Sequence, residues 1–141
     1  MRTLCNFLSV LILSAFAVMA AGSLQSEEST EAQVASQAPG LSVSARQLYS
    51  DYQSNGIAAD QMYKDQTILV TGTVDMIGKD IMDTMYVTLI GDGVIGSVQC
   101  YFAKAHENEL AGLRQGMSVS VKGRCDGKMI NVMMKGCTLA R

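Results

Sequence analysis

The most reactive side chains in this sequence belong to the cysteines and to the single histidine, His106. Cys5 lies in an apolar N-terminal run, so Cys100, Cys125 and Cys137 are the thiols of the remaining chain. A cysteine nucleophile needs a neighbouring base, but His106 falls in the polar stretch AKAHENE, which is typical of a solvated surface histidine. The cysteines also lack the CxxC spacing of a zinc site. We therefore expect neither a catalytic thiol nor a bound metal.

The same cysteines can instead crosslink the fold if the protein reaches an oxidising compartment. If the Asp-Gly pair after Cys125 makes a two-residue turn, Cys125 and Cys137 lie farther apart than the ~7 Å that a disulfide can span. One remaining pairing is Cys100 with Cys137, which requires a bulge at Gly136 to turn Cys137 inward. The other is Cys100 with Cys125, which agrees with the strand alternation without a bulge.

Other signatures of catalysis are missing from the sequence. The acids Asp75, Asp80, Asp83 and Asp92 fall in or beside predicted turns, where aspartate commonly bonds to the backbone. They do not follow the calcium-loop pattern, and no phosphate-binding glycine loop or nucleophile elbow occurs. The sequence therefore indicates a protein that is not an enzyme and needs no cofactor.

A ligand-binding face is the remaining candidate site. Two neighbouring predicted strands place Tyr86 and Tyr101 on the outward side, where aromatic rings can stack on bases or sugar rings. Tyrosines are also ordinary strand formers, so the same pattern suits a plain sheet surface. Basic residues from the predicted hairpin supply positive charge at the edge of this face. The candidate residues are Tyr86, Thr88, Gln99, Tyr101, Arg124 and Lys128.

Alternating apolar and polar residues predict the strands that position these side chains. The predicted strands are residues 67–76, 85–90 and 97–102 and the two arms of a hairpin over 117–139, with helices over 45–52 and 105–113. Five short strands with a helix between the third and fourth form the OB-fold arrangement. We therefore predict a mainly β protein, a five-stranded OB-fold barrel with an N-terminal helix, in one domain over residues 41–141.

The N-terminal segment predicts export. Arg2, an apolar run to Met19 and small residues up to Gly22 fit a secretory signal peptide over residues 1–22. The apolar run is shorter than the ~20 residues of a membrane-spanning helix, and a retained membrane anchor is the alternative. Residues 23–40 are polar and lack apolar periodicity, which predicts a disordered linker. The expected location is the periplasm or the medium.

Charge and methionine content set two further expectations. The net charge of -2 argues against a protein that coats nucleic acid, although residues 114–141 carry six bases and one acid.

Ten methionines are more than usual. We expect them to pack adaptably, with a soft metal such as Cu(I) as the alternative for any exposed group. The methionines in question are Met82, Met85, Met129, Met133 and Met134.

Several separated motifs resemble one known family. They are YKDQTILVTGTVDMIGKDI, YVTLIGDG, SVQCYF, LAGLRQGMSVSVKGRCDG and VMMKGC, in that order, within Ala45 to Leu139. Together they resemble the tRNA-anticodon-binding-like OB-fold family of small exported bacterial proteins and lipoproteins. The resemblance implies the OB-fold and no particular reaction. The chain departs from the lipoprotein members because no cysteine follows the apolar run.

These observations favour an exported, non-enzymatic OB-fold binding module for a protein, an oligosaccharide or an oligonucleotide. One alternative is an envelope structural or stress protein that acts only through protein–protein contacts. Another is a single-stranded nucleic-acid-binding protein, whose affinity would depend on salt.

Overall fold

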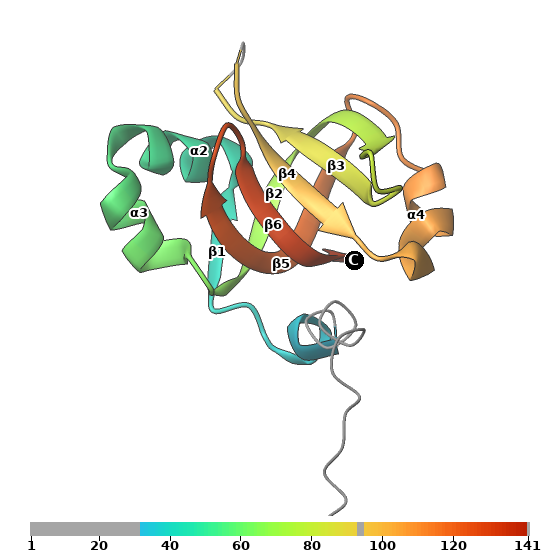
Figure 1. The fold of residues 1–141 in the computed structure, drawn as a ribbon, viewed down its shortest axis with the longest axis horizontal. Helices are drawn as coiled ribbons and strands as arrows, with labels where there is room; N and C mark the ends of the chain where they lie inside the picture. The colour runs from blue at the N-terminus through green and yellow to red at the C-terminus, as the bar shows by residue number, and fades with distance from the viewer. Residues whose placement is uncertain (1–31, 93–94, 141) are drawn as a thin grey trace, which may run out of the picture.

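The chain folds into a closed β-barrel, shown by a computed structural model that describes residues 32–92 and 95–140 (Figure 1). The barrel strands follow the order β2-β3-β4-β6-β5, and pairing of β2 with β5 closes it. They are β2 (Thr67–Lys79), β3 (Met85–Ile90), β4 (Ser97–Phe102), β5 (Ser118–Lys128) and β6 (Val132–Ala140). The prediction of a mainly β OB-fold barrel is therefore confirmed, and β4 and β6 pair in parallel within it.

The interior is formed by alternate residues of each strand, as the sequence pattern predicts. Ile68, Val70 and Val74 of β2 are fully buried, and Val87 and Leu89 of β3 face them. The register of β3 and β4 is continuous over six residue pairs, from Met85 opposite Phe102 to Ile90 opposite Ser97. This register fixes which side chains share the outer face of the two strands.

Helices cover the two ends of the barrel. α2 (Ala45–Ser54) begins where the Ser44 side chain accepts a hydrogen bond from the Gln47 backbone N–H, at 3.1 Å. It packs Leu48 onto the barrel and is followed by α3 (Gly56–Tyr63). At the opposite end, η1 (Lys104–His106) and α4 (Glu107–Ala111) replace the single helix predicted over 105–113 (Figure 1). Among the described residues, no helix is long and apolar enough to span a bilayer.

The first strand and the segment before it were not predicted. β1 (Leu41–Ser44) runs parallel to β2 and extends the sheet to six strands. Residues 32–40, expected to be disordered, lie against the barrel, because Lys122 Nζ donates to the carbonyls of Ala35 and Gln37 at 3.0 and 3.1 Å. Val34 is buried. The predicted signal peptide and residues 23–31 of the predicted linker lie outside the described residues.

The predicted hairpin is present, but its turn is not at Asp126-Gly127. Residues 129–131 make the turn, and the Asp-Gly pair forms a bulge inside β5. Cys125 pairs with Met134 and Gly127 with Met133, so Asp126 is the extra residue. Gly127 has φ +92, a left-handed conformation that glycine adopts easily in either a bulge or a turn. The Asp-Gly pair therefore does indicate a local change of the strand backbone, but that change is a bulge and not the hairpin turn.

A second bulge lies in β6 and controls a cysteine. Lys122 pairs with Thr138, and Arg124 pairs with Lys135, so β6 contains one extra residue between these pairs. Gly136 has φ +61 at this position. The bulge turns Cys137 inward, where its side chain is fully buried.

Candidate ligand-binding face

Two tyrosines form the centre of the candidate face. Tyr86 and Tyr101 pair directly across β3 and β4, with ring centroids 6.3 Å apart and planes inclined at 62°. The Tyr86 ring lies over Gly78 of β2, and its hydroxyl donates to the Met76 sulfur at 3.7 Å. Both rings are only partly buried. The structure thus places both predicted tyrosines on the outer surface, in contact with each other.

A chain of amide hydrogen bonds orders the polar part of this face. Gln99 Nε2 donates to the Tyr101 hydroxyl at 2.9 Å, and Asn131 Nδ2 donates to Gln99 Oε1 at 3.1 Å. Asn131 Oδ1 in turn accepts from the Ser97 backbone N–H at 3.3 Å. Thr88, predicted to be outward, is largely buried, and its hydroxyl bonds to the Met76 carbonyl at 3.5 Å. Thr88 therefore supports the face from below.

Two turns with apolar tips stand at the ends of this strand pair. The turn over residues 80–84 is held by Asp80 Oδ1, which accepts from the backbone N–H groups of Met82 and Thr84 at 2.8 and 2.9 Å. It leaves Ile81 102% and Met82 82% exposed. Met129 and Ile130 at the β5–β6 turn are also highly exposed. The expectation that Met82 and Met129 are packed is therefore wrong, because both occupy turn tips.

The predicted basic residues do not join the tyrosines. Lys128 Nζ lies 5.5 Å from the centre of the Tyr49 ring on α2, a cation–π contact at the helical end. Arg124 of β5 lies opposite Thr67 of β2 and Lys135 of β6 in the strand register. Its Nε is buried and has no hydrogen-bond partner among residues 32–92 and 95–140. Of the six predicted residues, the structure brings together Tyr86, Gln99 and Tyr101, with Thr88 beneath them.

The cations nearest this face already have carboxylate partners. Lys79 Nζ lies 3.1 Å from Asp83 and 3.6 Å from Glu107, and Lys135 Nζ lies 2.8 Å from Asp126. The hydrogen bond with Asp83 raises the pKa of Lys79. Burial raises the pKa of Tyr101, and the nearby negative charge of Asp80 adds to this effect. The face therefore presents the two tyrosine rings beside paired charges.

The three described cysteines are free thiols in the core. Burial raises the pKa of Cys137, and interaction with the Cys100 thiol raises it further. Burial likewise raises the pKa of Cys125, whose sulfur lies 3.5 Å from the Tyr52 hydroxyl. Thiols whose pKa is raised are weak nucleophiles. Cys100 is fully buried like the other two, and this burial fits a structural role for all three.

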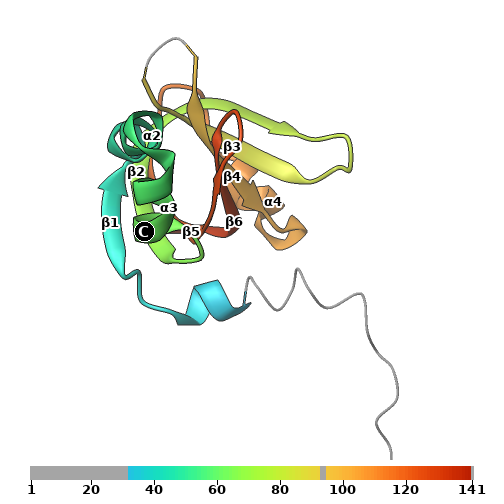
Figure 2. The same cartoon turned by 60° about the vertical axis from the view of Figure 1, so that its left-hand side comes forward.

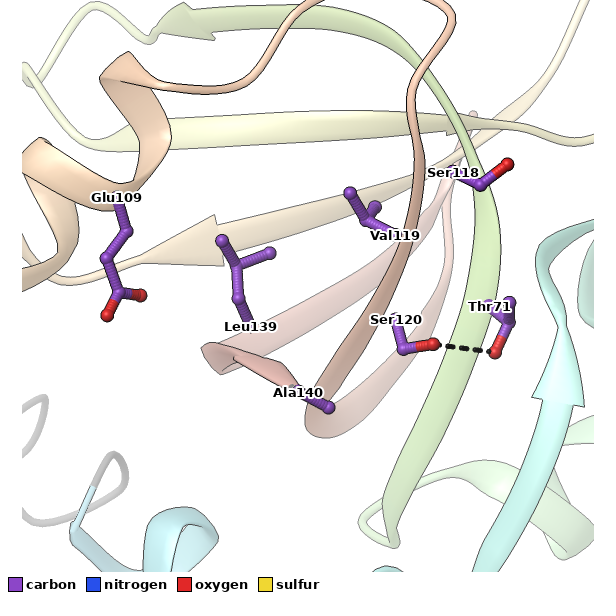
Figure 3. Close-up of a pocket in the computed structure, with 7 residues that line it drawn as sticks. All are labelled: Thr71, Glu109, Ser118, Val119, Ser120, Leu139 and Ala140. Carbon is purple, nitrogen blue, oxygen red and sulfur yellow. Dashed lines mark hydrogen bonds between the residues drawn. The ribbon is translucent and has the colours of Figure 1, made fainter.

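A separate pocket of about 440 Å³ opens between α4 and the ends of β5 and β6 (Figure 3). The polar side chains in its wall are Glu109, Ser118, Ser120 and Thr71. The hydroxyls of Thr71 and Ser120 are hydrogen-bonded to each other at 3.1 Å. None of its lining residues belongs to the tyrosine face. Across the described part of the chain, no group of three acidic, histidine or cysteine side chains is arranged to hold a metal ion.

Comparison with known proteins assigns the family. The tRNA_anti-like family model matches residues 1–138. The chain belongs to the tRNA_anti-like family. A solved structure of a Klebsiella pneumoniae protein, named as a putative nucleic acid-binding lipoprotein, has a similar fold, with a TM-score of 0.58 and 16% sequence identity. The match covers 78% of this chain and 97% of the Klebsiella chain.

Two solved structures, each of an OBody bound to hen egg-white lysozyme, are also similar. Their TM-scores are 0.40 and 0.43, with identities of 17% and 15%, over 54% and 57% of this chain and 94% and 86% of theirs. No curated protein matches this tRNA_anti-like chain.

Proposed function

We propose that this protein is a non-enzymatic binding module that recognises another macromolecule through the outer face of β3 and β4. The observation that carries the proposal is the Tyr86–Tyr101 pair, which is partly exposed and bordered by two turns with exposed apolar tips. The β3–β4 pair corresponds to strands two and three of the OB-fold, where such folds usually bind ligands. Aromatic rings of this kind contribute large contact areas at interfaces.

The proposal includes export to the cell envelope. The predicted signal segment supports it, as does the likeness of the fold to that of a protein named as a lipoprotein. In the envelope, the ligand would be a protein, an oligosaccharide or an oligonucleotide. A purely structural protein without a ligand on this face is the alternative that the experiment below must exclude.

Site-specific photocrosslinking in cells that produce the full chain tests the proposed face. A photoreactive benzoylphenylalanine replaces Met76, which is 55% exposed beside Tyr86, or Met62 on α3, which is also 55% exposed. We expect higher-mass adducts from position 76 and none from position 62. Equal adducts at both positions, or none at position 76, would reject the face.

A second step separates ligand classes and verifies the tyrosines. Peptide mass spectrometry of the purified adduct identifies a protein partner, and loss of the added mass on nuclease treatment identifies a nucleic acid. Combining the photoreactive residue at position 76 with Tyr86→Ala and Tyr101→Ala should remove the adduct, while circular dichroism shows that the barrel is still folded. An undiminished adduct in this variant would mean that the tyrosines do not contribute to binding.

A further inference from the structure

We propose that the partner on this face is a protein segment that combines apolar side chains with a net positive charge. This inference rests on the proposed function and adds the chemistry of the partner. It follows from three features: the spacing of the apolar turn tips, the way the turns are held, and the placement of charge around them.

The apolar tips stand at opposite ends of the β3–β4 pair. Residues 80–84 lead into Met85, at one end of the register, whereas Asn131 bonds to Ser97 at the other. Six residues per strand at ~3.3 Å each separate the two ends by about 17 Å. Because the tips lie beyond these strand ends, an extended peptide that crosses the tyrosines and contacts both tips needs at least about six residues.

Each turn is fixed in the conformation that exposes its tip. Besides the two bonds to Asp80 Oδ1, the Asp80 N–H donates to the Thr84 carbonyl at 2.9 Å and the Asp83 N–H to the Asp80 carbonyl at 3.0 Å. Figure 2 shows this β2–β3 turn projecting from the barrel. The other turn is closed by the bond from the Met129 N–H to the Asn131 carbonyl, at 3.2 Å. Ile81 and Ile130 therefore cannot fold back onto the core without breaking these bonds, and both side chains stay available to a partner.

Charge selects among possible partners. Lys79 and Lys135 are neutralised by carboxylates, so a nucleic-acid phosphate or an anionic lipid would have to displace existing ion pairs. At the β2–β3 turn, the carboxylates of Asp80, Asp83 and Glu107 outnumber the one ammonium of Lys79. A lysine or arginine in the partner complements this excess of negative charge. Apolar anchors with a basic residue are thus the chemistry that fits.

Selection from a random peptide library, displayed on phage and applied to the immobilised full chain, tests this chemistry. The variants are Ile130→Asn on the face and Ile57→Asn on α3, two isoleucines that are each 78% exposed. We expect enriched peptides with apolar residues and a net positive charge, and loss of their enrichment with Ile130→Asn but not with Ile57→Asn. Loss of a buried anchor should weaken the best peptide about tenfold or more.

A charge variant tests the acidic end separately. Asp83→Asn with Glu107→Gln removes two negative charges, and asparagine suits the positive φ of 63° at residue 83. We expect this variant to weaken the selected basic peptide and to reduce its dependence on salt. Unchanged affinity would reject the role of charge.

The outcomes distinguish failure of the partner chemistry from failure of the face. Peptides that need Ile130 but carry no positive charge would overturn this inference and retain the proposed face. Peptides that bind both isoleucine variants equally would overturn both proposals. Enrichment of no peptide overturns the inference, and salt-sensitive binding of an oligothymidylate would then favour a nucleic acid. Self-association through the face in sedimentation experiments would identify a second copy as the occupant instead.

Discussion

The Tyr86 ring rests on Gly78, so closely that a β-carbon on residue 78 would lie 3.0 Å from the tyrosine oxygen. Glycine at this position therefore lets the ring approach β2 closely beside Tyr101. The contact connects the backbone of one strand to the geometry of the proposed binding surface.

Gly78→Ala should move Tyr86 and weaken binding on this face while leaving the barrel folded. Because Tyr86 is partly exposed and its ring can give way, we expect a loss of no more than about 1 kcal/mol in unfolding free energy. Nuclear magnetic resonance shifts of the two tyrosine rings measure the displacement. Gly56→Ala is the control, because its new β-carbon meets nothing within 4 Å. Unmoved ring signals in Gly78→Ala would refute the proposed packing.

A second close approach should be costly. The Cys137 sulfur lies 2.7 Å from the place a β-carbon on Gly123 would occupy, in the fully buried interior. Gly123→Ala should destabilise the protein by about 1–3 kcal/mol, because the core cannot accept the extra carbon without strain. Adding Cys137→Ala should restore part of that loss, so that the double variant is more stable than the sum of the single effects predicts. Urea unfolding of the three variants measures this coupling, and strict additivity would contradict it.

The cysteine pairing remains a prediction, and the bulge at Gly136 favours one alternative. With Cys137 turned inward, its thiol interacts with Cys100, whereas Cys125 contacts Tyr52. We expect oxidised glutathione to produce a disulfide between Cys100 and Cys137, with the two electrons and two protons of the cysteine thiols passing to glutathione disulfide, which leaves as two glutathione thiols. Trypsin separates the three cysteines onto different peptides, so mass spectrometry identifies the pair. A crosslink to Cys125, or three remaining thiols after oxidation, would reject this pairing.

Alkaline pH should weaken the fold. Burial raises the pKa of Tyr63 from 10.0 to about 12, and its hydroxyl donates to Asp51 at 2.6 Å. The folded state thus favours the neutral phenol, so this contribution is complete below pH 10 and disappears as the pH rises towards 12. At ~1.4 kcal/mol per unit, the loss is about 1–3 kcal/mol. Urea unfolding from pH 8 to 11.5 measures it, and Tyr63→Phe should show a shallower decline. Equal slopes for both proteins would exclude Tyr63 as the cause.

Strand alternation was sufficient to predict the barrel and its core. Ile68, Val70 and Val74 share one face of the predicted strand, with Leu69, Thr71 and Thr73 on the other, and the structure buries the first three. The outward positions of Tyr86 and Tyr101 follow from the same alternation. The local sequence pattern is informative here because the backbone of a β-strand points successive side chains to opposite faces.

Features that depend on distant partners were predicted less well. An Asp-Gly pair suits a turn and a bulge equally. Only the pairing of β6 with both β5 and β4 places a bulge at Asp126 within β5. The ordering of residues 32–40 depends on Lys122, which lies 85 or more positions away in the sequence. The exposure of Met129 was missed because the hairpin turn was expected at Asp126-Gly127. The turn that contains Met82 was predicted, but the apolar side chain at its tip was still expected to pack.

The docking of Ala35 and Gln37 onto Lys122 also determines how the barrel would respond to mechanical tension. A pulling force on the chain before residue 32 reaches these two carbonyl contacts first and the β1–β2 ladder next. Because β1 runs parallel to β2, a force directed along the strands loads their four residue pairs together in shear rather than one after another. From β2 the load would pass directly to β3 of the proposed binding face, because the two strands are paired.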